Sequence, residues 1–430
     1  MAEEALNSQL TAATSERDAS PFMKGSTRLT ALIWGLVCLG LVMVTSASGG
    51  NAVDPESLQS AALRRGLWVC VGALAFLAGR SIDYRFWRRH NYAILAVGII
   101  GLIAVLIPGI GSTVNGARRW IRFGSIVGVQ PSEFAKIAIC IWVAAYAERN
   151  ARQMDTVLEG FAYPLGVIGV TSLLVLMEPD FGTSVLIGVI GTAVLVVSGT
   201  RILLVTLGGL ALLPVAYQLV LGTPYRRERL MIFLNPWADP RDSGYQLIQS
   251  KIATGSGGLL GEGLGSGLQK MGFLPGARND FIFAIIAEEL GFVGGAIVIL
   301  LFLWLLWEGF RVAMKATERF GFALAFGITF FIALQAAFNV AVVTGSVPPK
   351  GLSLPFVSAG GSSLFFTLFA AGILVKIAAT AEKPPATETK AWYRDVPEYQ
   401  HAAERAARWA GGVIAGVASS LRHEVKRWLK

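Results

Sequence analysis

One stretch of the chain, residues 270–291, places a carboxylate and two cations at the start of a long apolar run. Lys270, Arg278 and Asp280 lie in a polar segment marked by Gly and Pro, and the apolar run begins directly after Asp280. A carboxylate at the water end of a membrane helix, flanked by cations, suggests chemistry at a membrane surface. Asp is also a frequent N-cap residue, so a helix-capping role for Asp280 is the structural alternative.

The apolar run that follows, residues 281–307, contains two acids. Glu288 and Glu289 are its only charged residues. Ionisable groups inside a membrane span are costly and usually functional, so the pair favours a functional interpretation of the whole stretch. Glu288 is not expected to act together with Asp280, because a helical rise of ~1.5 Å per residue puts it ~12 Å deeper along the helix.

Composition places the chain among polytopic membrane proteins. Of its 430 residues, 54% are hydrophobic and 15% are charged, whereas soluble globular proteins are roughly 25% charged. Cys38, Cys70 and Cys140 lie in apolar runs without a ligand pattern, so neither disulfides nor a zinc site is indicated. The three histidines are scattered and form no metal cluster or triad. The net charge of +9 comes mainly from membrane-flanking loops and the tail, which favours contact with anionic lipid over nucleic acid.

Ten apolar segments, several of them close to the ~20 residues that cross a bilayer, predict an all-α polytopic membrane protein. They cover residues 29–47, 66–80, 91–108, 132–147, 161–177, 183–199, 202–221, 281–306, 322–344 and 364–380. The predicted domains are a polar tail at 1–28, a ten-helix membrane domain at 29–380, and a linker with a basic tail at 381–430. The apolar residues of that tail recur at helical spacing opposite basic ones, which favours an interfacial helix or a partner-docking helix.

The distribution of Lys and Arg predicts that both termini are cytoplasmic, as the positive-inside rule requires. Two loops on the outer side are nevertheless basic. One holds Arg118, Arg119 and Arg122, and the large loop at 222–280, between the seventh and eighth helices, holds seven Lys or Arg residues. Positive charge on the unfavoured side suggests an anionic ligand there. Long loops also cross regardless of charge, and this alternative explains 222–280 better than the short arginine cluster.

Four other residues near these loops are candidates for a binding site. Glu133 and Lys136 follow Pro131 at a helix start and lie three apart on one face. Such a pair more often lines a site within the bilayer, whereas an exposed pair only stabilises the helix. Trp120 is either an interfacial anchor or part of the site. Ser358 lies in KGLSLPFVSAGGSS, whose composition favours irregular backbone lining a cavity, but it lacks the leading Gly of a G-x-S-x-G nucleophile.

Several sequence blocks, taken together and in order, resemble the SEDS family (shape, elongation, division and sporulation). The blocks are GARRWI with QPSEFAK, EPDFGT, NPWADPRDSGYQLIQSKIATGSGGLLGEGLG, QKMGFLPGARNDFIFAIIAEELG and LPFVSAGGSS. They lie between the predicted helices and cover roughly residues 29–380. EPDFGT and GEGLGSGLQK resemble the FtsW division branch more than the RodA elongation branch.

The resemblance implies a peptidoglycan glycosyltransferase that polymerises lipid II at the outer face of the bacterial cytoplasmic membrane, at the division septum. Its partners would be lipid II, membrane lipid, a class B penicillin-binding protein and other division proteins, with no nucleic acid. Asp280 would be the catalytic base, and one base would suffice because pyrophosphate is a good leaving group. The expected substrate contacts are Arg119, Trp120, Glu133, Lys136, Lys270, Arg278 and Ser358. The sequence requires no cofactor, although a divalent cation, Mg²⁺ or Mn²⁺, could assist at the phosphates.

Two other functional classes remain open on the sequence. A lipid II flippase would need a polar path across the bilayer, which Glu133, Lys136, Glu288 and Glu289 could line, but no inverted repeat is evident. A non-catalytic scaffold of the division complex would explain the tails but not the acids and cations in the outer loops. Purified protein with lipid II in detergent separates these classes, because glycan chains require catalysis.

Overall fold

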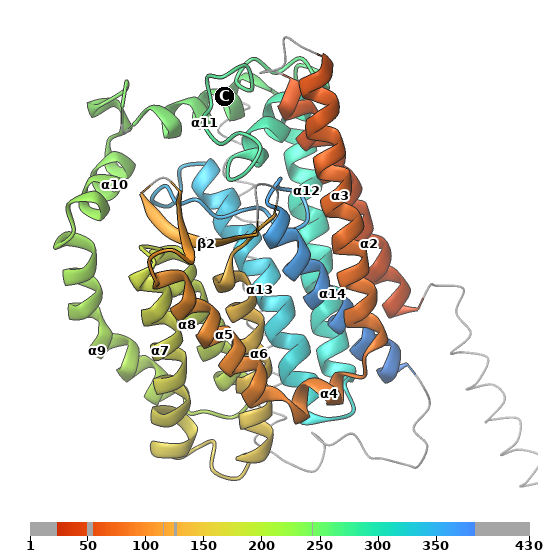
Figure 1. Ribbon diagram of the computed structural model, residues 1–430, viewed down its shortest axis with the longest axis vertical. Helices are drawn as coiled ribbons and strands as arrows, with labels where there is room; N and C mark the ends of the chain where they lie inside the picture. The colour runs from red at the N-terminus through yellow and green to blue at the C-terminus, as the bar shows by residue number, and fades with distance from the viewer. Residues whose placement is uncertain (1–23, 50–54, 115, 124–126, 243, 383–430) are drawn as a thin grey trace, which may run out of the picture.

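Each of the ten apolar segments overlaps a helix over most of its length in the computed structural model, which describes residues 24–49, 55–114, 116–123, 127–242 and 244–382 (Figure 1). The helices are α2 (Gly25–Gly49), α3 (Pro55–Ser81), α5 (Asn91–Leu106), α6 (Pro131–Arg149), α7 (Tyr163–Met177), α8 (Phe181–Val197), α9 (Ile202–Leu221), α12 (Ile282–Lys315), α13 (Arg319–Val343) and α14 (Gly361–Ala381). A short helix, α4 (Tyr84–Arg89), joins α3 to α5. The tails at 1–23 and 383–430, including the predicted amphipathic helix, lie outside the described residues.

Six helical segments among the described residues are long and apolar enough to cross a membrane by length and composition. They are residues 25–48 of α2, the continuous stretch of η1 (Leu158–Ala162) and α7, and helices α9, α12, α13 and α14. α5 and α8 are apolar but shorter. α12 continues past its predicted end at 306 because buried Val312 and Ala313 extend its packed face. The chain is therefore a predominantly helical membrane protein.

Helices α3 and α14 pack side by side through glycines (Figure 1). A Cβ at Gly79 of α3 would collide with the carbonyl oxygen of Phe369, and one at Gly372 of α14 would collide with that of Phe76. Small residues at such positions allow helix backbones to approach closely, which is how membrane helices gain packing energy. This pairing fixes the middle of α14 against α3.

Helices α6 and α9 differ sharply in their surroundings. α6 is buried along nearly its whole length and packs against α5, α8 and α13. α9 has no buried residue, contains Pro214, and lies at the margin of the bundle (Figure 1). The polar residues of α6 are therefore interior groups, whereas α9 contributes no residue to the buried core.

The all-α prediction misses a small sheet between α5 and α6. Its strands are β1 (Gly111–Val114), β2 (Ala117–Phe123) and β3 (Val127–Val129), paired antiparallel in the order β1-β2-β3. Ser112 pairs with Trp120, and the Ser112 hydroxyl donates to the Trp120 carbonyl at 3.0 Å. Successive residues of a strand face opposite sides, so β2 presents Arg119 and Trp120 in different directions.

The large loop at 222–280 contains α10 (Pro224–Leu234), η2 (Pro236–Ala238) and α11 (Tyr245–Ser256), followed by a Gly-rich segment. That segment packs against a break in α12. Gly291 has φ 67°, a left-handed conformation that glycine adopts without steric cost, and the helix is interrupted there. The large loop is thus joined to the membrane bundle at the break.

Backbone hydrogen bonds between the Gly-rich segment and α12 satisfy the groups that the break releases. The N–H groups of residues 262 and 263 donate to the carbonyl groups of Glu288 and Glu289, both at 3.0 Å. In return, the N–H groups of residues 292 and 293 donate to the carbonyl groups of residues 258 and 259. Irregular backbone in a membrane protein is tolerated where it is paired in this way.

Candidate active site

Asp280 lies in the turn that ends the large loop, two residues before α12 begins. Phe281 occupies the N-cap position and no side-chain hydrogen bond caps the helix, so the structure does not show the capping role considered for Asp280. Its main chain is held by Asn339 of α13, whose Nδ2 donates to the carbonyl groups of Asp280 (2.7 Å) and Leu352 (2.6 Å). Gly351 packs against the carboxylate, since a Cβ there would lie 2.5 Å from Oδ2.

Arg119 links the small sheet to the turn between α7 and α8. Its Nε donates to the carbonyl of Glu178 (3.1 Å), and its Nη2 donates to the carbonyl of Pro179 (2.6 Å). The guanidinium is thereby held at the start of α8. Trp120, the next residue along β2, packs its ring near Gly128 of β3.

Two more cations come from other elements. Lys350, in the loop before α14, forms an ion pair with Asp180 (Nζ–Oδ1 3.0 Å), and the Asp180 side chain also caps α8 through the N–H of Thr183. Arg229 of α10 donates from Nη1 to the carbonyl of Pro349 at 2.8 Å. These contacts bring α8, α10 and the loop before α14 to the same end of the bundle.

These charged groups act together on Asp280. Burial raises the pKa of Asp280 to about 6, and the nearby Asp180 carboxylate raises it as well. The cations Arg119, Arg229 and Lys350 oppose this shift. A carboxylate with a pKa near 6 is mostly ionised at neutral pH yet more basic than an ordinary Asp, which suits a general base.

The two acids near Arg119 differ in protonation state. Burial acts to raise the pKa of Asp180, but Lys350 and Arg119 outweigh it and the pKa is lowered, so Asp180 is ionised. Burial, with help from Asp180, raises the pKa of Glu178 to about 8. Both carboxyl oxygens of Glu178 are buried without a hydrogen-bond partner among the described residues. Glu178 is therefore mostly a neutral acid at pH 7.

Glu133 and Lys136 form the ion pair that their spacing predicts, with Nζ and Oε1 2.9 Å apart. The Lys136 side chain is fully buried, so the pair is not an exposed one that only stabilises its helix. Lys136 also donates to Oε1 of Gln335 on α13 (2.6 Å), and Gln335 Nε2 donates to the carbonyl of Ser353 (2.9 Å). This network joins α6 and α13 to the loop that carries Lys350.

Ser358 and Arg278 lie where the loop before α14 meets the turn before α12. The Ser358 hydroxyl donates to the carbonyl of Asn279 (2.6 Å) and accepts from the N–H of Leu354 (2.7 Å). The N–H of Ala359 donates to the carbonyl of Arg278 at 3.0 Å, while the Arg278 side chain is exposed. In the described structure, Ser358 holds backbone in place and Arg278 keeps an accessible cation.

Lys270 belongs to a second, buried cluster. Its Nζ donates to Oε1 of Glu289 (2.6 Å) and to the hydroxyl of Ser46 on α2 (3.1 Å). The same Ser46 hydroxyl is within 2.8 Å of both Glu289 oxygens, and Glu288 accepts two backbone N–H groups of the Gly-rich segment. The two glutamates of the apolar run thus hold the Gly-rich segment on α12.

The sequence alone did not single out four of the residues around Asp280. In the sequence, Glu178 and Asp180 are two acids of the EPDFGT block, Arg229 is one of the seven Lys or Arg residues of the large loop, and Lys350 begins the segment KGLSLPFVSAGGSS. Lys350 had a usable signal, because it is the only charged residue between α13 and α14. The two acids gave none, since the cations that act on them, Arg119 and Lys350, are distant in the sequence.

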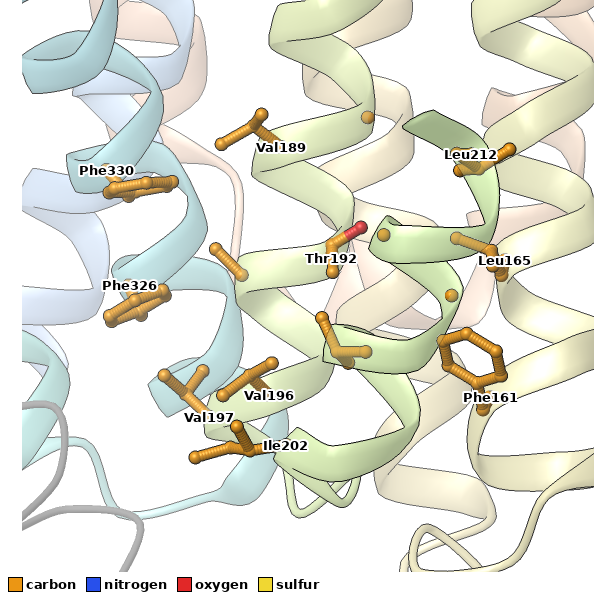
Figure 2. A pocket seen from close by; sticks show the side chains of 15 residues that line it. Phe161, Leu165, Val189, Thr192, Val196, Val197, Ile202, Leu212, Phe326 and Phe330 are labelled. Carbon is orange, nitrogen blue, oxygen red and sulfur yellow. The ribbon is translucent and has the colours of Figure 1, made fainter. Parts of the chain in front are cut away.

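A separate apolar cavity of about 630 Å³ lies between α7, α8, α9 and α13 (Figure 2). Phe161 and Leu165 line one side, Phe326 and Phe330 another, and Thr192 contributes a hydroxyl. None of the ionisable residues discussed above lines this cavity. It is distinct from the charged group around Asp280.

Across the described residues, no group of three or more His, Cys, Asp or Glu side chains is placed to hold a metal ion. The site is instead a carboxylate of raised pKa among three cations, at one end of a helical membrane bundle. A carboxylate and cations in this arrangement suit acid–base chemistry beside an anionic ligand. The chain belongs to the cell cycle protein family of FtsW, RodA and SpoVE, which matches residues 27–383.

Relatives and solved structures agree with this assignment. The chain is 42% identical over 352 residues to the probable peptidoglycan glycosyltransferase FtsW of Geobacter metallireducens, covering 81% of this chain and 93% of that protein. It is 41% identical to the stage V sporulation protein E of Bacillus subtilis, covering 80% and 93%.

Two solved structures share the fold. One is a chain from work on the structural coordination of polymerization and crosslinking by a peptidoglycan synthase complex, with TM-score 0.69, 30% identity and coverage of 83% of this chain and 98% of that one. The rod shape determining protein RodA of Thermus thermophilus matches with TM-score 0.60, 26% identity and coverage of 83% and 97%.

Proposed function

We propose that this protein is a peptidoglycan glycosyltransferase that polymerises lipid II into glycan strands. The observation that carries the proposal is Asp280, a carboxylate of raised pKa beside Arg119, Arg229 and Lys350. The names of the relatives and of the synthase complex support the same activity. The substrate is therefore a lipid-linked disaccharide carrying a pyrophosphate, which is the anionic group that the cations suit.

Asp280 acts as the general base. It accepts the proton of an acceptor sugar hydroxyl as that oxygen attacks the anomeric carbon of the donor sugar. The new glycosidic bond forms while the bond from the anomeric carbon to the pyrophosphate oxygen breaks, and the electron pair leaves with the pyrophosphate. No second acid is needed, because the leaving group departs as an anion and is not protonated, unlike the leaving group of most glycosidases.

Arg119, Arg229 and Lys350 stabilise the charge that develops on the departing pyrophosphate. Cations lower the barrier most when they are held in place before the reaction begins. All three are fixed by contacts to other protein groups. Arg278, with its exposed side chain, supplies a further cation for the phosphates. Trp120, beside Arg119 on β2, contacts the substrate sugar.

The remaining predicted site residues act by supporting these groups. Glu133 and Lys136 hold the loop that carries Lys350 through Gln335, and Ser358 holds the turn before Asp280. Lys270 remains a proposed substrate cation, with its ion pair to Glu289 as the competing structural role.

The membrane setting follows from the same proposal. Ten helices span the bacterial cytoplasmic membrane, both tails are cytoplasmic, and the Asp280 end faces outward. The partners are a class B penicillin-binding protein that crosslinks the new strands and other proteins of the division septum. The likeness to a chain from a synthase complex for polymerization and crosslinking supports such a pairing.

The test uses purified full-length protein with lipid II in detergent. Wild type is expected to form glycan chains, and Asp280→Asn is expected to form none while eluting as a folded, monodisperse protein. Normal chain formation by Asp280→Asn would exclude Asp280 as the base. Absence of chains with wild type, together with lipid II transfer in sealed vesicles, would favour a flippase instead.

A further inference from the structure

Arg65, on α3, is a buried cation that contacts main-chain carbonyl groups. The residue is 3% exposed, and its Nη2 donates to the carbonyl oxygens of Phe356 (3.0 Å) and Val357 (3.2 Å). Its Nε and Nη1 have no hydrogen-bond partner in the described part of the chain. Burying a guanidinium without a carboxylate costs free energy, so an apolar side chain would be more favourable here if the position only needed to be filled.

Helix α2 contacts the same two residues. A Cβ at Gly40 would lie 2.8 Å from the carbonyl oxygens of both Phe356 and Val357, so only glycine leaves room for them. Phe356 has φ 65°, a left-handed conformation that is unfavourable for a bulky residue. Strained backbone of this kind persists where its surroundings fix it. Arg65 and Gly40 together are called the turn socket below.

The turn held by this socket is bonded directly to the backbone before Asp280. Ser358, the next residue after Val357, donates to the carbonyl of Asn279 at 2.6 Å. One residue further, the N–H of Ala359 donates to the carbonyl of residue 278 at 3.0 Å. The turn socket is therefore one hydrogen-bonded segment away from Asp280.

We propose that Arg65 is a positioning residue for Asp280, acting with Gly40 through the turn at residues 356–359. This role rests on the proposed function, because it assigns a purpose to the position of Asp280 in that reaction. Arg65 itself touches neither Asp280 nor the cations around it in the described contacts. Its contribution is to fix where the carboxylate lies relative to Arg119, Arg229, Lys350, Asp180 and Glu178.

A positioning role has a kinetic signature different from a binding or folding role. A displacement of about 1 Å in a reacting group can lower turnover about 100-fold. Loss of the socket is expected to lower kcat about 10- to 100-fold and to change KM less than about threefold. The acid limb of the pH–rate profile should also move, because Asp280 shifts relative to the charges that set its protonation.

The experiment measures lipid II polymerisation by full-length protein in detergent between pH 5 and pH 8. Arg65→Met removes the donor, whereas Arg65→Lys keeps a cation that can still donate to a carbonyl group and should recover part of kcat. Gly40→Ala pushes on the same turn and should reproduce the effect. Gly35→Ala is the matched control on α2, because a Cβ there meets nothing within 4 Å.

A folded Arg65→Met protein with the kcat and acid limb of wild type would overturn the proposal, as would a raised KM at unchanged kcat. If Arg65→Met does not fold, Arg65→Lys and Gly40→Ala decide: equal kinetics for Gly40→Ala and Gly35→Ala contradict a positioning turn. The wild-type and Asp280→Asn results distinguish failure of the proposed function from failure of the positioning role of Arg65. Absence of glycan chains with wild type removes the proposed function, and an active Asp280→Asn protein removes Asp280 as the base. An inactive Asp280→Asn protein with normal Arg65→Met removes only the positioning role.

Discussion

Lys350 and Asp180 join two segments that are far apart in the sequence, with Lys350 Nζ 3.0 Å from Asp180 Oδ1. The stem of Lys350 lies against Gly182, where a Cβ would be 2.8 Å from its Cγ. The pair fixes the loop before α14 on the first turn of α8. It also sets the balance of charge near Asp280, since both partners act on the pKa of that carboxyl.

Lys350→Met is expected to lower activity and to move the acid limb of the pH–rate profile to higher pH. The substitution removes a cation that lowers the pKa of Asp280 and leaves Asp180 without its main partner. Removing one partner of a buried ion pair costs roughly 3–5 kcal/mol of stability. Because the Lys350 side chain is 21% exposed, the expected loss of stability is about half of that amount. Thermal melting and a pH–rate series check both effects. An unchanged acid limb in a folded Lys350→Met protein would contradict the coupling.

Asp180→Asn is expected to move the acid limb of the pH–rate profile to lower pH. In wild type the rate should rise with pH as Asp280 loses its proton, with a midpoint at about pH 6. The Asp180 carboxylate is the second cause of that raised pKa, after burial, so its neutralisation should shift the midpoint below pH 6. Profiles for both proteins at fixed ionic strength make the comparison. A shift upward, or none, would show that Asp180 does not act on the base.

Asp280→Asn is expected to be more stable than wild type at pH 8 even though it is inactive. The folded pKa of about 6 lies above the ordinary value of 3.8, so the folded state binds the proton more tightly and loses stability as pH rises from 4 through 6. A shift of about 2 units corresponds to about 3 kcal/mol, and partial exposure of Asp280 reduces this to ~1–2 kcal/mol. Melting curves at pH 8 and pH 5 should show the gain of the Asn variant shrinking toward the lower pH. A constant gain would point to a cause other than ionisation.

Glu178→Gln is expected to keep polymerisation at pH 7 within about threefold of wild type. The Glu178 carboxyl has a pKa of about 8 and is therefore already neutral at pH 7, like an amide. Between about pH 4.5 and pH 8 wild type should lose stability, because the unfolded chain releases the Glu178 proton at a lower pH than the folded state does, and the Gln variant should not show this loss. Rates at pH 7 and melting at pH 5 and pH 8 test both statements. A large loss of rate at pH 7 would mean that the ionised carboxylate takes part in the reaction.

Much of the fold could be predicted because each of the ten long bundle helices carries its own apolar run. The small sheet was missed because the seven residues of β2 alternate too briefly to outweigh an all-helical pattern. Asp280 was found because it stands alone where a long apolar run begins. Arg65 was not, since a cation at the end of an apolar run is usually an ordinary membrane-flanking residue. The role of Lys350 and Asp180 depends on their contact with each other, and no local sequence pattern predicts a contact between distant loops.

Lys270 and Arg119 were both expected to bind the substrate pyrophosphate, and their surroundings now lead to different expectations. Arg119 reaches the group around Asp280 from an edge of β2, so Arg119→Ala should weaken lipid II binding and lower kcat with little loss of stability. Lys270 is almost fully buried in its pair with Glu289. Lys270→Met should therefore destabilise the protein by roughly 3–5 kcal/mol, because the partners left to buried Glu289 in the described part of the chain, the Ser46 hydroxyl and the N–H of Gly265, are uncharged.

The combination of Lys270→Met with Glu289→Gln distinguishes the two roles of Lys270. If Lys270 serves the ion pair, neutralising both partners should recover most of the lost melting temperature, and polymerisation should return with it. If Lys270 binds the pyrophosphate, the double variant should regain stability yet remain weak in lipid II binding. Binding and melting measured on the same preparations decide between these outcomes. Weak binding by Lys270→Met at unchanged stability would assign Lys270 to the substrate site, because an intact fold then excludes loss of the ion pair as the cause.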